Sequence, residues 1–222
     1  MEYDISLSEY PNEICLALYH SFCPLCCGWC FNKNRLKNST VSYSKAKKII
    51  NNNYEFISSV CLTGGEPLLI KDFYKISKYI KNNDLKLKIN TSGIIPITQD
   101  VDIDYVNISI KGDFFDYQSV GYQKKQDDLI NSINSFFVSK FVEFSIVYYP
   151  EKEFQSVRNF IYKLRPPNSL VLVQLQQGYC LNNYYNTLKK TTRQKLLQEA
   201  SFYDINCKYY IETREYGREE VK

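Results

Sequence analysis

The sequence has a single histidine, His20, among its 222 residues. A catalytic pair of histidines is therefore excluded, and so is a metal site built mainly from imidazole. No run of about 18 apolar residues occurs either, so the sequence predicts no membrane-spanning helix. The first ten residues, MEYDISLSEY, are acidic and polar, which is unlike a signal peptide.

Strong charge of one sign is also missing. The formal net charge is +4 and the lysines are scattered, so we do not expect a nucleic-acid-binding surface. Apolar residues make up 44% and charged residues 23%, which is ordinary for a soluble globular protein. These properties predict a cytoplasmic protein, in which the eight cysteines act as ligands or free thiols rather than as disulfides.

Short apolar runs alternate with segments of helical periodicity. The predicted strands are residues 14–20, 56–63, 85–90, 105–111, 142–149 and 170–176. The predicted helices are residues 44–53, 71–82, 126–138, 153–164 and 191–203. Strands that alternate with helices indicate right-handed βαβ units and a parallel sheet.

The number of predicted strands limits the choice of fold. They are too few for a closed eight-stranded barrel, which typically needs about 250 residues, so a doubly wound sheet and an incomplete, splayed barrel both fit. Residues 112–126 and 178–190 are predicted to be loops. The tail from about residue 212 is predicted to be a solvated, frayed end.

Four cysteines lie within eight positions in the stretch SFCPLCCGWC, directly after the first predicted strand. Cys23, Cys27 and Cys30 form C-x3-C-x2-C, in which three thiolates would hold an iron–sulfur cluster and leave one iron open. Together with Cys26 they also form two abutting C-x-x-C pairs, which is a zinc pattern. Because the adjacent Cys26 and Cys27 do not easily converge on one ion, the cluster is favoured over zinc and over unliganded thiols.

A second motif, LTGGEPLL, ends the second predicted strand. Gly64 and Gly65 permit positive φ and let a ligand approach the backbone, while the Glu66 carboxylate is suited to a cationic amine. The alternative is an ordinary glycine turn from a strand to a helix. The motif ends the strand after the cysteine loop, at the sheet edge where such folds place their chemistry, and this favours a binding site.

Three later strands also end in polar segments. These are NTSG with Asn90 and Ser92, SIKG with Ser109 and Lys111, and VQLQQG with Gln174. Each segment taken alone fits a polar strand exit. Taken together, they are predicted to line one pocket with the cysteine loop and the G-G-E motif.

The combined pattern resembles the radical S-adenosylmethionine (SAM) superfamily, including an aromatic residue, Trp29, just before the third cysteine. The opening SLSEYPNEICLALYHSFCPLCCGWCFN looks like that of activating enzymes for anaerobic ribonucleotide reductase and related glycyl radical enzymes. The segments YVNISIKG and SLVLVQLQQG are similar to strand segments of that family. Two positions depart from the family's pattern: Phe31 stands where a histidine is frequent, and Ser109 where an aspartate that helps to bind a cation is frequent.

The resemblance covers about residues 5–180 and implies one domain over residues 1–222, with a C-terminal helix and tail over 181–222. The implied fold is an incomplete parallel β/α barrel of about six strands. The implied [4Fe-4S] cluster is ligated by Cys23, Cys27 and Cys30. The residues implied around SAM are Trp29, Phe31, Gly64, Gly65, Glu66, Asn90, Ser92, Ser109, Lys111 and Gln174.

The resemblance also implies roles within this set. The G-G-E segment would hold the SAM amino group and the backbone at Phe31 the adenine. Asn90, Ser92 and Lys111 would contact the ribose and the carboxylate. With one electron from a flavodoxin- or ferredoxin-like donor, SAM would yield methionine and a 5′-deoxyadenosyl radical, which takes hydrogen from the substrate.

The substrate implied by the resemblance is a protein, a glycyl radical enzyme. One alternative is a radical SAM enzyme that modifies a small molecule, a peptide or an RNA nucleoside. The second alternative is a non-enzymatic zinc-binding module.

Overall fold

Nine strands of the described residues form one sheet, and their order in space is their order along the chain. The computed structural model describes residues 2–32, 40–152, 154–178 and 180–221. The strands are β1 (Glu2–Ser6), β2 (Cys15–His20), β3 (Ser59–Gly64), β4 (Lys86–Thr91), β5 (Tyr105–Ile110), β6 (Val142–Tyr148), β7 (Ser169–Gln174), β8 (Lys208–Thr213) and β9 (Gly217–Val221). Strands β2 to β8 run parallel, whereas β1 and β9 pair antiparallel with their neighbours. Within the described residues no pairing joins β1 to β9, so the sheet is an incomplete barrel.

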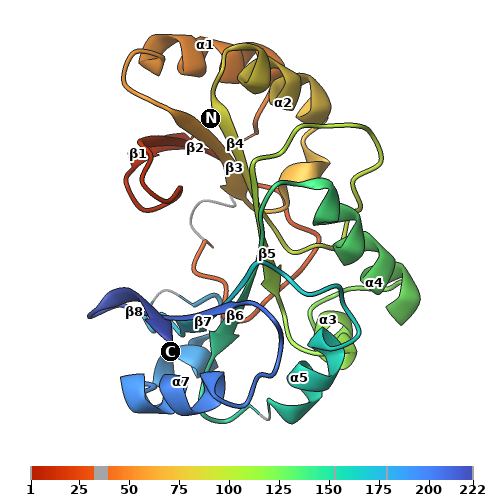
Figure 1. Cartoon of the computed structure of the whole chain (residues 1–222), viewed down its shortest axis with the longest axis vertical. Coiled ribbons are helices and arrows are strands. Elements are labelled where there is room, and N and C mark those ends of the chain that lie inside the picture. The colour runs from red at the N-terminus through yellow and green to blue at the C-terminus, as the bar shows by residue number, and fades with distance from the viewer. Residues whose placement is uncertain (1, 33–39, 153, 179, 222) are drawn as a thin grey trace.

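Helices cover the outer side of the curved sheet (Figure 1). The described helices are α1 (Tyr43–Asn53), α2 (Phe73–Asn82), α3 (Phe114–Ser119), α4 (Gln126–Asn134), α5 (Gln155–Ile161), α6 (Asn183–Thr187) and α7 (Arg193–Ala200), with short 3-10 turns η2 (Pro67–Leu69) and η3 (Ser135–Val138). Helix α6 lies at the cysteine loop, where Tyr185 contacts Trp29. Helices α1 and α2 contact β2 and β4, and α7 contacts β7 and β8. None of the described helices is long and apolar enough to cross a bilayer.

The two faces of the sheet differ in chemistry because successive strand residues point to opposite sides. The outer face presents aliphatic and aromatic side chains, such as Leu62, Ile108 and Phe144, which are fully buried in the core against the helices. The inner face carries a polar row of residues paired in register across four strands: Asn90, Asn107, Glu143 and Ser169. The main hydrophobic core therefore lies outside the sheet, and its concave side carries this polar row.

The predicted fold class is confirmed. The six predicted strands are β2 to β7, and the five predicted helices are α1, α2, α4 continued by η3, α5 and α7. The expected number of about six strands is too low, because β1, β8 and β9 extend the sheet at its ends. Residues 2–6 are mostly exposed, so β1 has no apolar pattern to reveal it.

The predicted frayed tail is wrong. Residues 208–213 and 217–221 form a hairpin whose first strand pairs with β7. The charged sequence of β9 does not favour a strand, but pairing with β8 satisfies its backbone groups, and this outweighs the weak propensity. The two predicted loops also contain helices, α3 and α6. Helix α3 starts at a capping box between Asp113 and Asp116.

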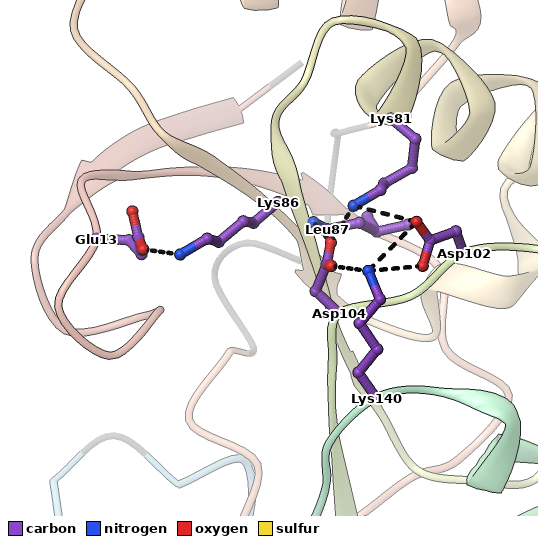
Figure 2. A network of polar contacts seen from close by, with 7 residues as sticks. All are labelled: Glu13, Lys81, Lys86, Leu87, Asp102, Asp104 and Lys140. Atoms are coloured by element: carbon purple, nitrogen blue, oxygen red, sulfur yellow. Dashed lines mark hydrogen bonds and ion pairs between the residues drawn. The ribbon is translucent and has the colours of Figure 1, made fainter.

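Charged side chains join the amino-terminal ends of β4 and β5 (Figure 2). Lys81 and Lys140 both pair with Asp104, whose carboxylate also accepts a hydrogen bond from the Leu87 N–H at 2.8 Å. Burial opposes ionisation of Asp104, but hydrogen bonds from the two lysines hold its pKa below the ordinary value. This network lies at the sheet edge away from the cysteine loop, where it contributes to stability.

Candidate active site at the cysteine loop

The cysteine loop follows β2 at the carboxyl end of the sheet. Cys27 is buried and Cys23 and Cys30 are partly buried, whereas Cys26 is exposed. The loop is held by a hydrogen bond from the Cys26 N–H to the Val120 carbonyl at 2.7 Å and one from the Cys30 N–H to the Cys27 carbonyl at 3.0 Å. The three sulfurs of C-x3-C-x2-C thus share a sheltered environment, and the fourth cysteine does not.

Burial raises the pKa of the Cys23 thiol to about 11. Burial also raises the pKa of Cys27, and the charge of Lys111 opposes this rise at both cysteines. Lys111 therefore lies close enough to the loop to favour thiolates. Binding of iron releases the thiol protons, so a nearby cation assists the ligand set that a cluster needs.

The two glycines of the G-G-E motif are required by the cysteine loop itself. The Gly65 N–H donates to the His20 carbonyl at 2.6 Å, and the Glu66 N–H donates to the Phe22 carbonyl at 2.8 Å. A Cβ at Gly65 would lie 2.1 Å from the Phe22 carbonyl oxygen, and Gly64 has φ of +104°. The motif and the cysteine loop are therefore packed backbone against backbone at the ends of neighbouring strands.

Glu66 is completely buried. One carboxylate oxygen accepts from the Thr91 hydroxyl at 2.7 Å and from the Leu68 N–H at 3.4 Å. The other accepts from the Ser92 N–H at 3.0 Å and from the Ser92 hydroxyl. All four lone-pair positions of this carboxylate are thus used within the chain. In this arrangement Glu66 joins the motif to the end of β4.

The remaining residues predicted for SAM fall into two groups. Ser92 bonds Glu66, and the Lys111 ammonium donates to the Ser109 hydroxyl at 2.8 Å, so these lie at the carboxyl ends of β4 and β5 near the loop. Asn90 donates to the Glu9 carboxylate at 2.9 Å on the concave face, and its own amide oxygen is buried without a hydrogen-bond partner among the described residues.

Gln174 does not lie with the others. Its amide donates to the Thr191 carbonyl and accepts from the Arg214 N–H at 3.2 Å. It pairs in register with Tyr148, which stacks on Phe154 at the start of α5. Gln174 therefore faces the helices, and the expectation that it lines the pocket is wrong. Val173 takes that place on the inner face.

An aromatic cluster covers the cysteine loop, and sequence reasoning missed most of it. Trp29 contacts Tyr185 edge-on, with ring centroids 5.6 Å apart, and lies 6.3 Å from Tyr149. A Cβ at Gly28 would lie 2.5 Å from the Tyr185 ring, and the Asn182 N–H donates to the Gly28 carbonyl at 2.8 Å. Trp29 thus anchors the loop to residues 182–185.

Phe31 has an exposed side chain. The next residue, Asn32, donates from its side chain to the Gly64 carbonyl at 3.2 Å. This bond links the end of the cysteine loop to the G-G-E motif, so the backbone around Phe31 lies near that motif.

A family profile described as the radical SAM superfamily matches residues 18–161. The chain belongs to the radical SAM superfamily. Members of this superfamily use a [4Fe-4S] cluster and S-adenosylmethionine, which removes the zinc module left open by the cysteine spacing. The chemistry of the donor set fits such a cluster, because one loop supplies three thiols that are buried or partly buried, and Lys111 acts on two of them.

Comparisons of sequence and of structure show which known proteins this radical SAM chain is similar to. Over 97 residues it is 33% identical to a probable GTP 3',8-cyclase of Methanococcus maripaludis, a match that covers 40% of the chain and 33% of that relative. The matched segment therefore spans about a third of the relative's length. Neither this relative nor the two structures described next is a glycyl radical activating enzyme.

The fold is similar to that of Streptococcus suis SuiB bound to precursor peptide SuiA, with a TM-score of 0.65 and 18% identity over 89% of this chain and 48% of that one. It is also similar to TYW1 with a lysine-pyruvate adduct bound, with a TM-score of 0.61 and 15% identity over 91% of this chain and 77% of that one. At these identities the likeness shows the radical SAM fold alone.

Beneath the loop, the concave face of this radical SAM domain carries charges that the motifs did not reveal. Arg218 of β9 pairs with Glu143 of β6, which is almost completely buried. The guanidinium of Arg218 lies over the Tyr210 ring, 4.1 Å from its centroid. The signal for Glu143 was present in VEFSIVYY, where polar and apolar residues alternate, but the pairing with Arg218 needs the hairpin.

Proposed function

We propose that this protein is a radical SAM enzyme that modifies a small polar molecule bound on the concave face of its sheet. The observation that supports this proposal is the polarity of that face. Buried or partly buried Lys88, Asn90, Asn107 and Glu143 line it, whereas the apolar core lies on the opposite side. A buried polar surface of this kind is costly unless it serves a polar ligand or forms a complete network.

In the proposed enzyme Cys23, Cys27 and Cys30 ligate the cluster. The backbone at Gly64 and Gly65 holds the SAM amino group, Ser109 and Lys111 contact its carboxylate, and Glu66 positions the motif by bonding Thr91 and Ser92. With one electron from a flavodoxin- or ferredoxin-like donor, the bound cosubstrate supplies a 5′-deoxyadenosyl radical that removes a hydrogen atom from the substrate.

The chain's own residues position the substrate and limit access of water. Trp29, Tyr149 and Tyr185 cover the loop, and the polar residues of β4, β5 and β6 orient a hydrophilic molecule below it. No acid–base pair is required of the protein, which agrees with the single histidine in the sequence.

The test is anaerobic reconstitution with iron and sulfide followed by reduction in the presence of SAM. We expect a brown protein that releases 5′-deoxyadenosine, and faster release when the small-molecule filtrate of a cell extract is added. Stimulation by the retained macromolecules instead of by the filtrate would contradict the substrate class. A colourless protein that releases no 5′-deoxyadenosine would contradict the enzyme itself.

Activation of a glycyl radical enzyme is the second candidate. It is supported by the open sheet, which leaves room for a loop of a partner protein, and by the opening segment of the sequence. It requires a glycyl radical signal by paramagnetic resonance when reduced enzyme and SAM are mixed with the partner. The charged concave face suits a polar small molecule better than a glycine loop, so we place this candidate second.

A further inference from the structure

On the concave face, four other charged side chains act electrostatically on Glu212. The charges that act on Glu212 of β8 are those of Arg218, Glu143, Lys88 and Glu9. The group therefore contains three carboxylates and two cations, drawn from five separate segments of the chain. The inference below rests on the proposed function, because it concerns the substrate of that same face.

Two of the three carboxylates have hydrogen-bond donors within the chain. Glu143 accepts from the Asn107 amide at 2.9 Å and from the Ser169 hydroxyl at 2.8 Å, and it pairs with Arg218. The Glu9 carboxylate accepts from the Asn90 amide at 2.9 Å.

The two cations are also occupied. Arg218 is committed to Glu143, and the Lys88 ammonium donates to the backbone carbonyl of Glu9. Neither forms an ion pair with Glu212 among the described residues. The third carboxylate, that of Glu212, therefore has no direct partner among the described residues, although the charges of its neighbours act on it.

Glu212 occupies a defined position on the inner face. It pairs in register with Val173 on β7 and with Arg218 on β9, near the carboxyl end of β8. Its carboxylate accepts no hydrogen bond from the residues that the structure describes. Its neighbours Ile211 and Thr213 are buried on the other face, so the direction of Glu212 is fixed by the strand.

We propose that Glu212 binds a protonated amine of the substrate. An ammonium group supplies the positive charge that the group of five lacks, and it supplies the N–H donors that this carboxylate lacks. Charge-assisted hydrogen bonds of this kind are among the strongest in proteins.

Burial raises the pKa of the Glu212 carboxyl, and the charge of Arg218 opposes this rise. An amine bound in contact would favour the ionised carboxylate, so the two charges stabilise each other. This is consistent with a site that is completed by its ligand.

Two other occupants fit less well. A metal ion needs several converging donors that are free to bind it, but Glu143 is already paired with Arg218 and the Glu9 carboxylate already accepts from the Asn90 amide. The SAM amino group belongs to the cysteine-loop edge, where Glu66 and Lys111 are the charged side chains that act on Cys23. The group around Glu212 is made of different residues.

The experiment is anaerobic equilibrium dialysis of the reconstituted protein with L-amino acids, putrescine and ethanolamine, each compared with its N-acetyl form by mass spectrometry. We expect at least one amine to be retained, with binding weakened by about tenfold or more on acetylation and in Glu212→Gln. Glu215→Gln is the matched control, because that carboxylate is 62% exposed in the turn of the same hairpin. It should leave binding unchanged.

Retention of no amine, equal retention of amine and acetylated forms, or unchanged binding in Glu212→Gln would each overturn the inference. Thermal melting checks the fold of the variant, and Glu212→Asp, which keeps the charge, should restore part of the binding. Release of 5′-deoxyadenosine without added substrate is measured in parallel. If that release persists while amine binding is absent, only this inference fails, and if the release is absent, the proposed function fails.

Discussion

Individual residues decide which atoms of the cysteine loop are available for chemistry. Four thiols lie within a short loop, yet only three of them are sheltered and Cys26 points to solvent. Gly65 is equally specific, since the Phe22 carbonyl occupies the space of its missing side chain. At the scale of single residues, the site depends on the exposure of Cys26 and on the absence of a side chain at Gly65.

The cysteines give the most direct test. We expect Cys27→Ala to lose most of the bound iron and the release of 5′-deoxyadenosine, because a cluster normally needs each of its thiolates. Cys26→Ala should keep both, since its exposed thiol is outside the proposed ligand set. Iron and sulfide analysis of the reconstituted variants measures this. Equal loss in both variants would indicate that Cys26 is a ligand.

Gly65→Ala tests the contact between the two motifs. The added Cβ would lie 2.1 Å from the Phe22 carbonyl, so the loop and the motif must move apart. We expect weaker SAM binding and destabilisation by roughly 1–3 kcal/mol, measured by dialysis and by urea unfolding. Gly217→Ala is the control, because Gly217 has positive φ but open space around it. If the control variant lost SAM binding to the same extent, the contact argument would fail.

Secondary-structure elements bring distant parts of the chain to the same place. The hairpin of β8 and β9 carries Arg218 to Glu143, 75 positions earlier in the chain. The connection into β5 carries Asp104 to the lysines of α2 and of the segment before β6. The pair of Arg218 and Glu143 contributes to the concave face. The pairs of Asp104 stabilise the sheet at the amino-terminal ends of β4 and β5.

Arg218→Ala should cost about 2 kcal/mol of unfolding free energy, because it removes the cationic partner of Glu143, whose side chain stays buried. Arg193→Ala removes a more exposed ion pair, with Glu219 of β9, and should destabilise the protein clearly less than Arg218→Ala does. Urea denaturation at neutral pH compares the two variants. Similar costs would mean that the burial of Glu143 contributes little.

The Asp104 network predicts a pH dependence of stability. Because the folded pKa of Asp104 is lowered, its contribution is present above the ordinary carboxyl pKa of about 4 and is lost as the pH falls through the folded value. Asp104→Ala should therefore destabilise by about 2 kcal/mol near pH 7 and by progressively less below pH ~4. Asp102→Ala, at a side chain that is 53% exposed, is the control with a small effect at either pH. If the destabilisation caused by Asp104→Ala grew as the pH fell, the lowered pKa of Asp104 would be contradicted.

In the molecule as a whole, the residues that stabilise the fold and the residues proposed for chemistry lie on opposite faces of one sheet. Apolar side chains pack outward against the helices, while polar and charged side chains gather inward near the carboxyl ends of the strands. An incomplete barrel allows this division because its concave side stays accessible. Neighbouring residues of one strand can therefore have opposite roles.

Two adjacent residues of β5 test this division. Ile108→Ala should destabilise by roughly 2–5 kcal/mol, since Ile108 is fully buried on the outer face. Ser109→Ala removes the hydroxyl that accepts from Lys111, so it should change stability by less than about 1 kcal/mol and weaken SAM binding. Thermal melting and equilibrium dialysis provide the two readouts. A larger stability loss in Ser109→Ala would contradict the division of faces.

The sequence by itself determined the chemistry of the loop and the class of the fold. Cysteine spacing, the G-G-E motif and the alternation of strands with helices are local patterns, and local patterns are set by neighbours along the chain. Tertiary structure alone decided which side of a strand meets the helices, and so placed Gln174 away from the pocket. It also formed strands at both ends of the described chain, paired Arg218 with Glu143, and placed Glu212 beside Arg218. Such pairings depend on contacts between residues far apart in sequence, and hydrophobic periodicity carries no record of them.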